Sequence, residues 1–368
     1  MSQFSTYVGL DVHKNSIHVA FTNNETGETQ SLGGVANDLT RLLAKLEPLG
    51  DRGRVQVCYE AGPTGYGLYR RLNEIGYECH VVAPAKTPSI ASDRVNTDRR
   101  DAMKLARFLA TGHLTFIRVP TPEEEALRDL IRAREDIKIK ETNTKRQLNS
   151  MMLRHDRIFR TGKSHWTKMH FDWLDQQRFE FDASNEAKDT YLGEVRRYKL
   201  LLEEMDRRIE AVSATIERAD LVNALRAFKG IKTLTAATIV AEIGDLKRFP
   251  SAGKFASFLG LTPSEHSSGD TRSRGRITKA GNGRLRRMLV EAAWAYWRSP
   301  HVSRQLEARS AGVSNEIRDL SWKTQRRLHR RIHALNLRRV SSKKALVAVT
   351  RELACAIWAV GQEAKLTS

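Results

Sequence analysis

The distribution of strand and helix signals constrains the fold of this chain most. In the first hundred residues, four short runs are rich in β-branched or aromatic side chains, and helical segments ended by glycine lie between them. The strand-like runs are TYVGLDV, SIHVAFT, RVQVCYE and ECHVVAP, and the helical segments are ANDLTRLLAKLEPLG and TGYGLYRRLNEIG. Only HKNS separates the first two runs, which predicts an antiparallel hairpin, whereas the later runs each follow a helix. Residues 1–118 should therefore form an α/β domain with a mixed sheet.

Strand signals disappear after about Pro120, where long charged helices begin with the segment over 122–156. A second helical run carries apolar residues at alternating spacings of four and three, which is a heptad pattern. These residues are Tyr191, Val195, Tyr198, Leu202, Met205, Ile209, Val212 and Ile216. Such a seam forms either an antiparallel hairpin with the first helix or a coiled coil between chains, and the sequence favours neither. The predicted helical region covers 119–218, and its aromatic segment over 157–185 fits no regular pattern.

The remaining residues, 219–368, are predicted to be helical and carry most of the positive charge. Between Glu265 and Lys344, twenty Lys or Arg stand against six Asp or Glu, so less than a quarter of the chain holds +14 of its net charge of +19. A solvated helix face normally mixes both signs, so this excess indicates a surface that faces phosphates. Within it, EHSSGDTRSRGRITKAG over 265–281 has the composition of a flexible phosphate-binding loop, although one of its serines could be a nucleophile.

The net charge of +19 also narrows the class of partner, because it implies a polyanion and nucleic acid is the first candidate. A membrane surface is a poor alternative, since the longest nearly apolar stretch is only MLVEAAWAYW over 288–297. No secretory signal is visible at the start of the chain, so we expect a bacterial cytosolic location. Cys58, Cys79 and Cys355 lie far apart without zinc-site spacing and are expected to be small buried hydrophobes.

Four carboxylates form the candidate chemical centre. Asp11 and Glu60 each end an apolar strand, where an unpaired carboxylate is expensive, and Asp98 and Asp101 lie about one helical turn apart in NTDRRDAMKLARFL. If all four converge at one edge of the sheet, they form an oxygen cage for Mg²⁺ or Mn²⁺. Two such ions would stabilise the attacking and leaving oxygens in phosphoryl transfer.

Each carboxylate also has an ordinary interpretation. Asp98 can serve as a helix N-cap with Asp101 as a first-turn acid, and Asp11 can be a turn residue. A strand, Asp, turn and strand also begin sugar kinases and actin-like ATPases, but His13 and Lys14 would crowd an ATP phosphate there. The four acids together, in so basic a chain, favour a metal-dependent nuclease or recombinase.

Several motifs together resemble the DEDD transposases of bacterial insertion sequences, the serine-using recombinases guided by a bridge RNA. The motifs are YVGLDVHKNSIHVAF, CYEAGPTGYGLYRRL, NTDRRDAMKLARFLATG and FKGIKTLTAATIVAEIG with the segment that runs on to GRLRRML. The resemblance implies an N-terminal RuvC-like domain with an RNase H-like fold, coiled-coil helices and a helical C-terminal transposase domain. It also implies that Asp11, Glu60, Asp98 and Asp101 bind Mg²⁺.

The resemblance further implies a covalent mechanism. In the family a serine of the C-terminal domain attacks DNA and forms a phosphoserine link, and the matching position is Ser268, with Ser267 as the neighbouring alternative. Family members work as tetramers on donor and target DNA, with guide loops of the RNA, and one subunit's acids meet another's serine. We therefore expect a homo-oligomer that binds DNA and RNA.

The basic residues around the serine are the predicted nucleic-acid contacts. FKGIKTLTAATIVAEIG also looks like half of a helix-hairpin-helix, in which Lys232 replaces the second expected glycine, and a plain core hairpin is the alternative. The predicted contacts are Lys232, Arg272, Arg274, Arg276, Lys279, Arg284, Arg286 and Arg287. Two other functions stay open, namely a RuvC-like junction endonuclease that uses water as its nucleophile and a non-enzymatic nucleic-acid-binding protein.

Overall fold

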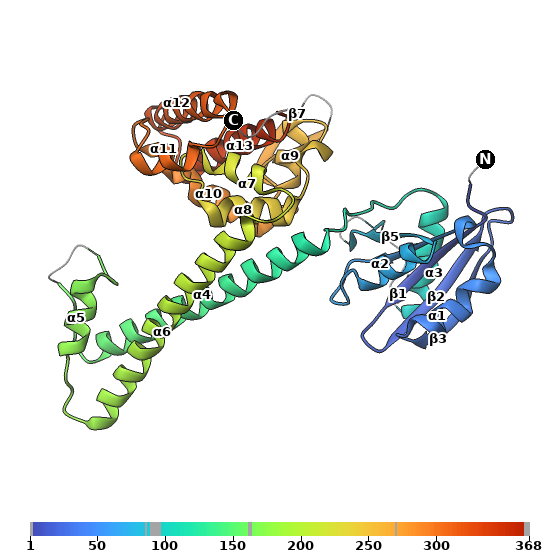
Figure 1. Cartoon of the computed structure of the whole chain (residues 1–368), viewed down its shortest axis with the longest axis horizontal. Coiled ribbons are helices and arrows are strands. Elements are labelled where there is room, and N and C mark those ends of the chain that lie inside the picture. The colour runs from blue at the N-terminus through green and yellow to red at the C-terminus, as the bar shows by residue number, and fades with distance from the viewer. Residues whose placement is uncertain (1–2, 85–86, 89–96, 161–163, 269–270, 364–368) are drawn as a thin grey trace. The chain divides into compact units, whose positions relative to one another are not determined.

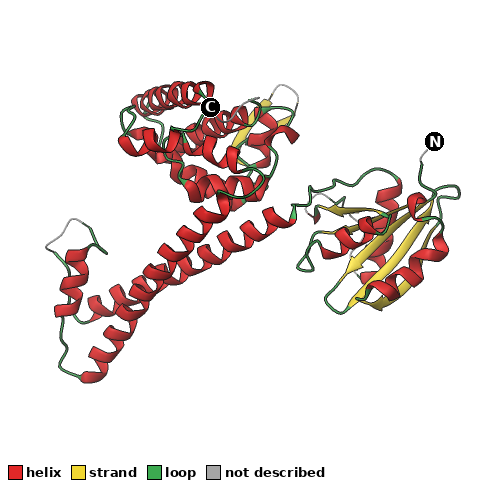
Figure 2. Ribbon diagram, in the orientation of Figure 1, coloured by secondary structure: helices red, strands yellow, loops and turns green. Residues whose placement is uncertain are grey.

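The chain forms two compact units, Met1–Val119 and Pro120–Ser368. The computed structural model describes residues 3–84, 87–88, 97–160, 164–268 and 271–363, and for 266–268 and 271–274 it describes the backbone alone. The first unit holds a five-stranded sheet with helices on its faces, and the second is largely helical (Figures 1 and 2). The predicted class, α/β plus all-α, is confirmed. The predicted boundary at 218/219 within the second unit stays a prediction.

The sheet of the first unit is mixed, as predicted. Its strands are β1 (Thr6–Val12), β2 (Ser16–Asn23), β3 (Thr29–Ala36), β4 (Val55–Glu60) and β5 (Glu78–Val82), in the order β3-β2-β1-β4-β5. The first three pair antiparallel, whereas β1 with β4 and β4 with β5 pair parallel, which is an RNase H-like arrangement. Strand β3 is missing from the sequence prediction because TQSLGGVA holds two glycines and lies at the sheet edge with no buried residue.

The two faces of the sheet carry different helices (Figure 1). On one face, α1 (Leu39–Leu46) and α2 (Gly67–Glu74) pack on alternate strand residues such as Val8 and Val57. On the other face lies α3 (Asp98–Ala110), which contributes Leu105 and Leu109 to a second, smaller cluster. Because side chains alternate along a strand, the residues of β1 and β4 that do not face α1 and α2 face α3.

Gly9 allows α3 to lie directly on β1. A Cβ atom at this position would be 2.3 Å from the carbonyl oxygen of Ala102 and 2.4 Å from the amide nitrogen of Ala106. Only a residue without a side chain permits this approach of helix backbone to strand. The contact holds the first turn of α3 close to the end of β1.

The second unit begins with two long helices that pack side by side, α4 (Pro122–Arg154) and α6 (Asp182–Ser213) (Figure 1). This pairing within one chain is the first of the two arrangements that the heptad pattern allows. Val195, Leu202 and Ile209 of the seam are buried. The end of the predicted seam is wrong, because Val212 is 36% exposed and α6 stops at Ser213.

The segment between α4 and α6, which fits no pattern in the sequence, contains α5 (Lys168–Gln176) and a cluster of aromatic rings. His170 lies at its centre, with its Nδ1 accepting a hydrogen bond from the Trp166 amide at 3.0 Å. Burial and, to a smaller extent, the charge of nearby His165 lower the pKa of His170 to about 4. His170 is therefore a neutral core residue at physiological pH.

The C-terminal part of the second unit is built of helices, most of which contribute buried side chains to one large core. These helices are α7 (Ala219–Arg226), α8 (Thr233–Ile243), α9 (Ala252–Phe258), α10 (Gly283–Ala293), α11 (Arg304–Ser310), α12 (Asn315–Leu337) and α13 (Ser342–Val360). Phe228 and Tyr296 are among its fully buried side chains. In the parts of the chain that the structure describes, no helix has both the length and the apolarity needed to cross a membrane.

Candidate active site

Asp11 and Glu60 lie at the same edge and on the same face of the sheet. Strands β1 and β4 are parallel neighbours, and Leu10 pairs with Tyr59, so the next residue of each strand is a carboxylate. Side chains two residues apart on a strand lie on the same face, so Asp11 lies on the face of Gly9, which is the face covered by α3. Glu60, beside Asp11 on β4, lies on this face too. They also line one pocket of about 570 Å³ together with the glycine-rich turn after Glu60.

The first turn of α3 adds the other two acids. Thr97 is the N-cap residue, and its hydroxyl accepts a hydrogen bond from the Arg100 amide at 3.4 Å, so the interpretation of Asp98 as the N-cap is wrong. Asp98 and Asp101 are first-turn acids instead, which the helix dipole favours. Both lie close enough to Asp11 to raise the pKa of its carboxyl by repulsion.

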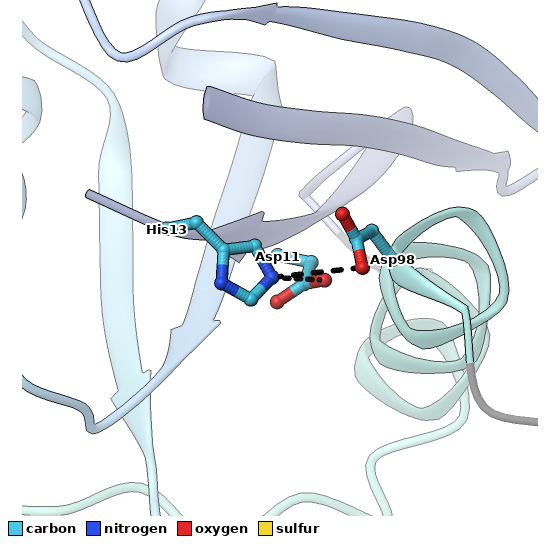
Figure 3. Close-up of side chains that lie close together, drawn as sticks. All are labelled: Asp11, His13 and Asp98. Carbon is cyan, nitrogen blue, oxygen red and sulfur yellow. Dashed lines mark hydrogen bonds and ion pairs between the residues drawn. The ribbon is translucent and has the colours of Figure 1, made fainter. Parts of the chain in front are cut away.

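His13 joins Asp11 to Asp98 (Figure 3). Its Nε2 is 3.1 Å from Oδ2 of Asp11 and 3.7 Å from Oδ1 of Asp98, while Nδ1 of His18 is 3.5 Å from Oδ2 of Asp98. Burial raises the pKa of Asp11 most, His13 lowers it, and Asp98 and Asp101 raise it again. The sequence predicts His13 only as an obstacle to phosphate, because its position in the turn after Asp11 does not reveal where its ring lies.

Glu60 has a neighbour that the sequence does not predict. The hydroxyl of Thr87 donates to Oε1 of Glu60 at 2.8 Å and lies 3.4 Å from the carbonyl oxygen of Ala83. In the part of the chain that the structure describes, Thr87 is the one side chain that donates to Glu60, and a neutral donor leaves the carboxylate its charge and further oxygen lone pairs. No sequence motif marks Thr87, which lies outside the helices and strands, after the end of β5 at Val82.

The donor set fits a divalent metal ion. Ligand atoms of Asp11, His13 and Asp98 all lie within 4.8 Å of one another. Carboxylate oxygens suit Mg²⁺ and Mn²⁺, and the imidazole nitrogen is a better ligand for Mn²⁺ than for Mg²⁺. The positive charge of an ion would offset the repulsion between Asp11, Asp98 and Asp101.

The segment predicted as a flexible loop is a β-hairpin, so the prediction of a loop is wrong, whereas phosphate binding by this segment stays a prediction. Strand β6 (Pro263–Ser268) pairs antiparallel with β7 (Thr271–Ile277). These strands could not be predicted from the sequence, because most of their residues are polar and a hairpin outside the core shows no alternation of apolar and polar residues. Ser268 is the last residue of β6. The side chains of Ser267, Ser268, Arg272 and Arg274 lie outside the described part of the structure.

The base of the hairpin is held tightly on both sides. Gly260 and Gly281 have positive φ angles of 65° and 78°, and a Cβ at Gly281 would be 1.9 Å from the carbonyl oxygen of Phe258. Arg286 donates from one guanidinium nitrogen to the carbonyl oxygens of Leu259 at 2.9 Å and Ala280 at 3.3 Å. In this conformation Arg286 connects the two chain segments that enter and leave the hairpin.

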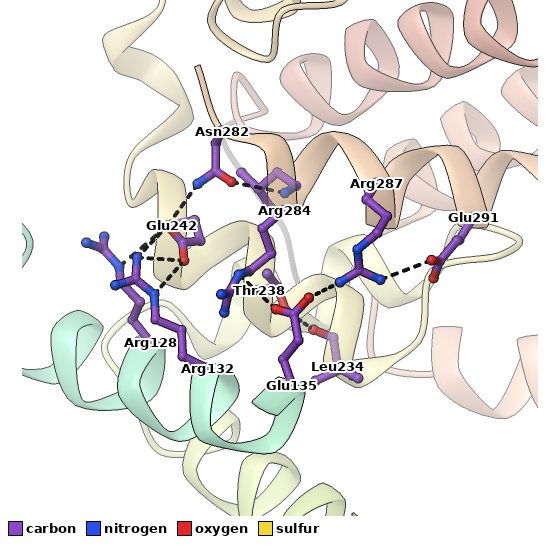
Figure 4. A network of polar contacts seen from close by, with 11 residues as sticks. Arg128, Arg132, Glu135, Leu234, Thr238, Glu242, Asn282, Arg284, Arg287 and Glu291 are labelled. Carbon is purple, nitrogen blue, oxygen red and sulfur yellow. Dashed lines mark hydrogen bonds and ion pairs between the residues drawn. The ribbon is translucent and has the colours of Figure 1, made fainter. Parts of the chain in front are cut away.

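Two other predicted phosphate contacts form ion pairs within the protein (Figure 4). Arg284 Nε is 2.8 Å from a carboxylate oxygen of Glu135 on α4, and Arg287 pairs with the same carboxylate and with Glu291. Arg276 and Lys279 are exposed at the hairpin. Nucleic-acid binding by these residues stays a prediction.

A second network in Figure 4 joins α4, α8 and the start of α10. Glu242, whose side chain is 6% exposed, accepts from Arg132 at 3.1 Å and from the amide of Asn282 at 2.9 Å, and Arg128 lies 3.7 Å away. Asn282 also caps α10 by accepting from the Leu285 amide. A buried carboxylate with this many partners keeps the segment after the hairpin in register with α4.

Lys232 lies in the turn between α7 and α8. Gly230 has a φ angle of 85°, and a Cβ there would be 2.3 Å from the Ala292 carbonyl oxygen. Lys232 is the exposed N-cap residue of α8 and makes no side-chain capping bond. This turn therefore packs against α10, as the core-hairpin alternative requires, while Lys232 is accessible to a ligand.

Family models and individual proteins match the chain over both units. A model of DEDD transposases of the IS110 type, described as Transposase, matches residues 8–155. A second, described as Transposase IS116/IS110/IS902 family, matches residues 222–308. These matches include all four acids and the serine hairpin.

Relatives match along almost the whole chain. A putative transposase, y4qE, from Sinorhizobium fredii is 40% identical over 98% of this chain and 90% of its own length. The transposase for insertion sequence element IS1533 from Leptospira borgpetersenii is 30% identical over 90% of this chain and 97% of its own. The chain therefore belongs to the IS116/IS110/IS902 family of transposases.

Proposed function

We propose that this transposase cleaves and exchanges DNA strands through a covalent phosphoserine intermediate, with Ser268 as the nucleophile. The observation that carries the proposal is the position of Asp11 and Glu60 at the ends of adjacent parallel strands, beside the first turn of α3. The residues that would hold a divalent ion, Mg²⁺ or Mn²⁺, are Asp11, Glu60, Asp98 and Asp101. When bound, such an ion supplies positive charge to the phosphoryl oxygens and to the attacking oxygen.

In the proposed reaction, the hydroxyl oxygen of Ser268 forms a bond to the scissile phosphorus. The bond from phosphorus to one bridging DNA oxygen breaks, and that leaving oxygen takes up the serine proton. Rejoining reverses this step with another DNA oxygen, so the number of phosphoester bonds is conserved and no ATP is needed. Arg276 and Lys279 supply positive charge near the hairpin, together with Arg272 and Arg274.

The proposed partners are donor DNA, target DNA and a guide RNA, bound by a homo-oligomer of two or four chains in the bacterial cytosol. The net charge of +19 supports a large polyanionic partner. In the proposed assembly the acids of one subunit act with the serine of another, as the family resemblance implies. Base pairing with the RNA would then select the DNA sites.

Trapping with a suicide DNA substrate tests the mechanism. The wild-type chain with Mg²⁺ should form a DNA adduct that protease removes, and Ser268→Ala should abolish the adduct while DNA binding persists. A serine nucleophile cannot be replaced by alanine, so the loss should exceed about a thousandfold. Ser267→Ala is the matched control; adducts that survive Ser268→Ala and vanish with Ser267→Ala would move the assignment by one residue.

A RuvC-like junction endonuclease that uses water is the alternative mechanism. It would cut the same substrate with Mg²⁺ and leave no protein on the DNA, in both serine variants. The non-enzymatic alternative is removed by the family, whose members are DNA-processing enzymes. Sequencing of RNA that copurifies with the wild-type chain tests the guide, and its absence would remove RNA guidance from the proposal.

A further inference from the structure

One edge of helix α12 carries exposed cations and aromatic rings that the proposed function does not use. The helix buries Ile317, Leu328 and Ile332 in the core. The adjacent edge of the helix, which carries His329 and His333, faces the short helix η5 (Trp294–Trp297). Nδ1 of His329 is 3.1 Å from the carbonyl oxygen of Tyr296, and the ring centroid of His333 is 6.3 Å from that of Trp297. This edge of α12 and η5 therefore form one continuous surface.

Two tryptophans lie at the centre of that surface. Trp294 is 52% exposed, and its ring is stacked on Trp297, with centroids 6.0 Å apart and planes 24° from parallel. Large aromatic side chains in soluble proteins are mostly covered, so an exposed indole that a second indole holds in place indicates a binding surface. A rigid indole face is a suitable support for another flat ring.

The two edges of α12 differ in how their arginines are paired. Helical spacing places Arg326 and Arg330 on the edge of His329 and His333, where both are exposed. Among the described residues, no carboxylate lies within ion-pair distance of either. On the edge that faces α13, by contrast, Arg327 and Arg331 each approach Glu352 to 3.4 Å.

Further positive charge lies at the end of η5. Arg298 is exposed, and Nζ of Lys229 donates to the carbonyl oxygens of Arg298 and Ser299 at 3.3 and 2.9 Å. The pKa of Lys229 is lowered by its burial and by the positive charge of Arg298. The surface thus combines stacked indoles with a local excess of cations.

We propose that this surface binds an unpaired stretch of nucleic acid. We call it the α12 strip, and its residues are Trp294, Trp297, Arg326, Arg330 and His333. A base would stack on the indole of Trp294, and the unpaired guanidinium groups would contact the flanking phosphates. A double helix offers no free base face for such stacking, so the α12 strip should prefer single strands. The proposal does not depend on the phosphoserine mechanism.

The test measures binding of the full-length chain to labelled oligo(dT) and oligo(U) of about 12 nucleotides, a length suited to such surfaces. Trp294→Ala should weaken binding about tenfold, because it removes one stacked base, and Trp294→Phe should retain most of the affinity. Arg326→Gln with Arg330→Gln should lower the slope of log affinity against log salt by about 1.4, the value for two lost phosphate contacts on a single strand.

The opposite edge of the same helix supplies the matched control. Arg327→Gln with Arg331→Gln removes the same charge but only arginines already paired with Glu352, so the salt slope should change by less than half as much. A loss that is confined to oligo(dT) or to oligo(U) would support the proposal and identify the strand as DNA or RNA.

Two results would overturn the proposal. The first is unchanged affinity of Trp294→Ala for both oligonucleotides, or an equal loss in the control double variant. The second is a Trp294→Ala chain whose assembly mass falls in light scattering while its oligonucleotide affinity stays the same, since the α12 strip would then be a contact between protein copies. Circular dichroism would establish that each variant is folded.

Discussion

At the scale of single residues, the neighbours of Asp11 shift the pKa of its carboxyl in opposite directions. Burial raises the pKa of its carboxyl, Asp98 and Asp101 raise it further, and His13 lowers it. An acid whose pKa is raised by folding stabilises the native state in its protonated form, and that contribution is lost as the pH rises through the raised pKa. At neutral pH without metal, the ionised carboxylate therefore destabilises the fold.

Asp11→Asn should accordingly leave the metal-free protein as stable as the wild type at pH 7, or more stable. It should also lose the stabilisation by metal, which for one site at a hundred times its dissociation constant is about 2.7 kcal/mol. Thermal unfolding with and without Mn²⁺ measures both effects. Asp51→Asn, an exposed carboxylate in the same unit, is the control and should respond to metal as the wild type does. A metal-free Asp11→Asn protein that melts well below the wild type would contradict this account.

Arg286 provides a second prediction at this scale. If its role is to hold the base of the hairpin through the carbonyls of Leu259 and Ala280, its shape matters more than its charge. Arg286→Lys should then cost about 1–3 kcal/mol of stability while the salt dependence of DNA binding stays the same. Arg276→Lys, at an exposed position, should cost no stability. A phosphate contact at Arg286 would give the opposite result, with stability kept in Arg286→Lys and the salt slope reduced in Arg286→Gln.

The sequence predicts strand ends better than it predicts what gathers around them. Asp11 and Glu60 could be placed at one sheet edge because each follows an apolar run, and the register of β1 with β4 puts them side by side. His13 and Thr87 could not be found in this way. Both residues lie outside the helices and strands, where no periodicity predicts the direction of a side chain.

At the scale of elements, the contact of α3 with β1 decides whether the acids meet. Gly9→Ala would place a methyl group 2.3 Å from the Ala102 carbonyl oxygen, so α3 must move or the strand must bend. We expect a loss of about 1–3 kcal/mol, together with weaker Mn²⁺ binding because the first turn of α3 shifts. Chemical denaturation and a metal titration measure the two effects.

Gly67→Ala is the matched control for that experiment. Nothing lies within 4 Å of a Cβ at this first residue of α2, and its φ angle is not positive. The substitution should be neutral or add about 0.4–1 kcal/mol. If both variants behaved alike, the close approach at Gly9 would not be what holds α3 on the sheet.

Elements were predictable from the sequence where an apolar pattern marks a buried face. Strands β1, β2, β4 and β5 and the long helices have such patterns, whereas β3 and the β6–β7 hairpin do not. These missed strands lie at an edge or outside the hydrophobic clusters. Backbone pairing stabilises them without requiring a particular side chain, so their sequences resemble loops.

At the scale of the whole molecule, the four acids belong to one compact unit and the serine hairpin to the other. Calorimetry should therefore resolve two unfolding transitions, of which only that of Met1–Val119 responds to Mn²⁺. At a hundred times the dissociation constant, its midpoint should rise by about 10 °C or more. Asp11→Asn should cancel this shift and leave the other transition in place. A single transition that moves as a whole would mean that the two units unfold together.

The network around Glu242 has a consequence for communication within the second unit. Arg128 and Arg132 of α4 and Asn282, which follows the hairpin, share this one carboxylate. If a ligand shifts the position of α4, these shared contacts would shift the preferred position of the hairpin as well. Thermodynamic linkage makes such an effect reciprocal, so a ligand bound at the hairpin would alter the affinity of a ligand bound along α4 by the same factor.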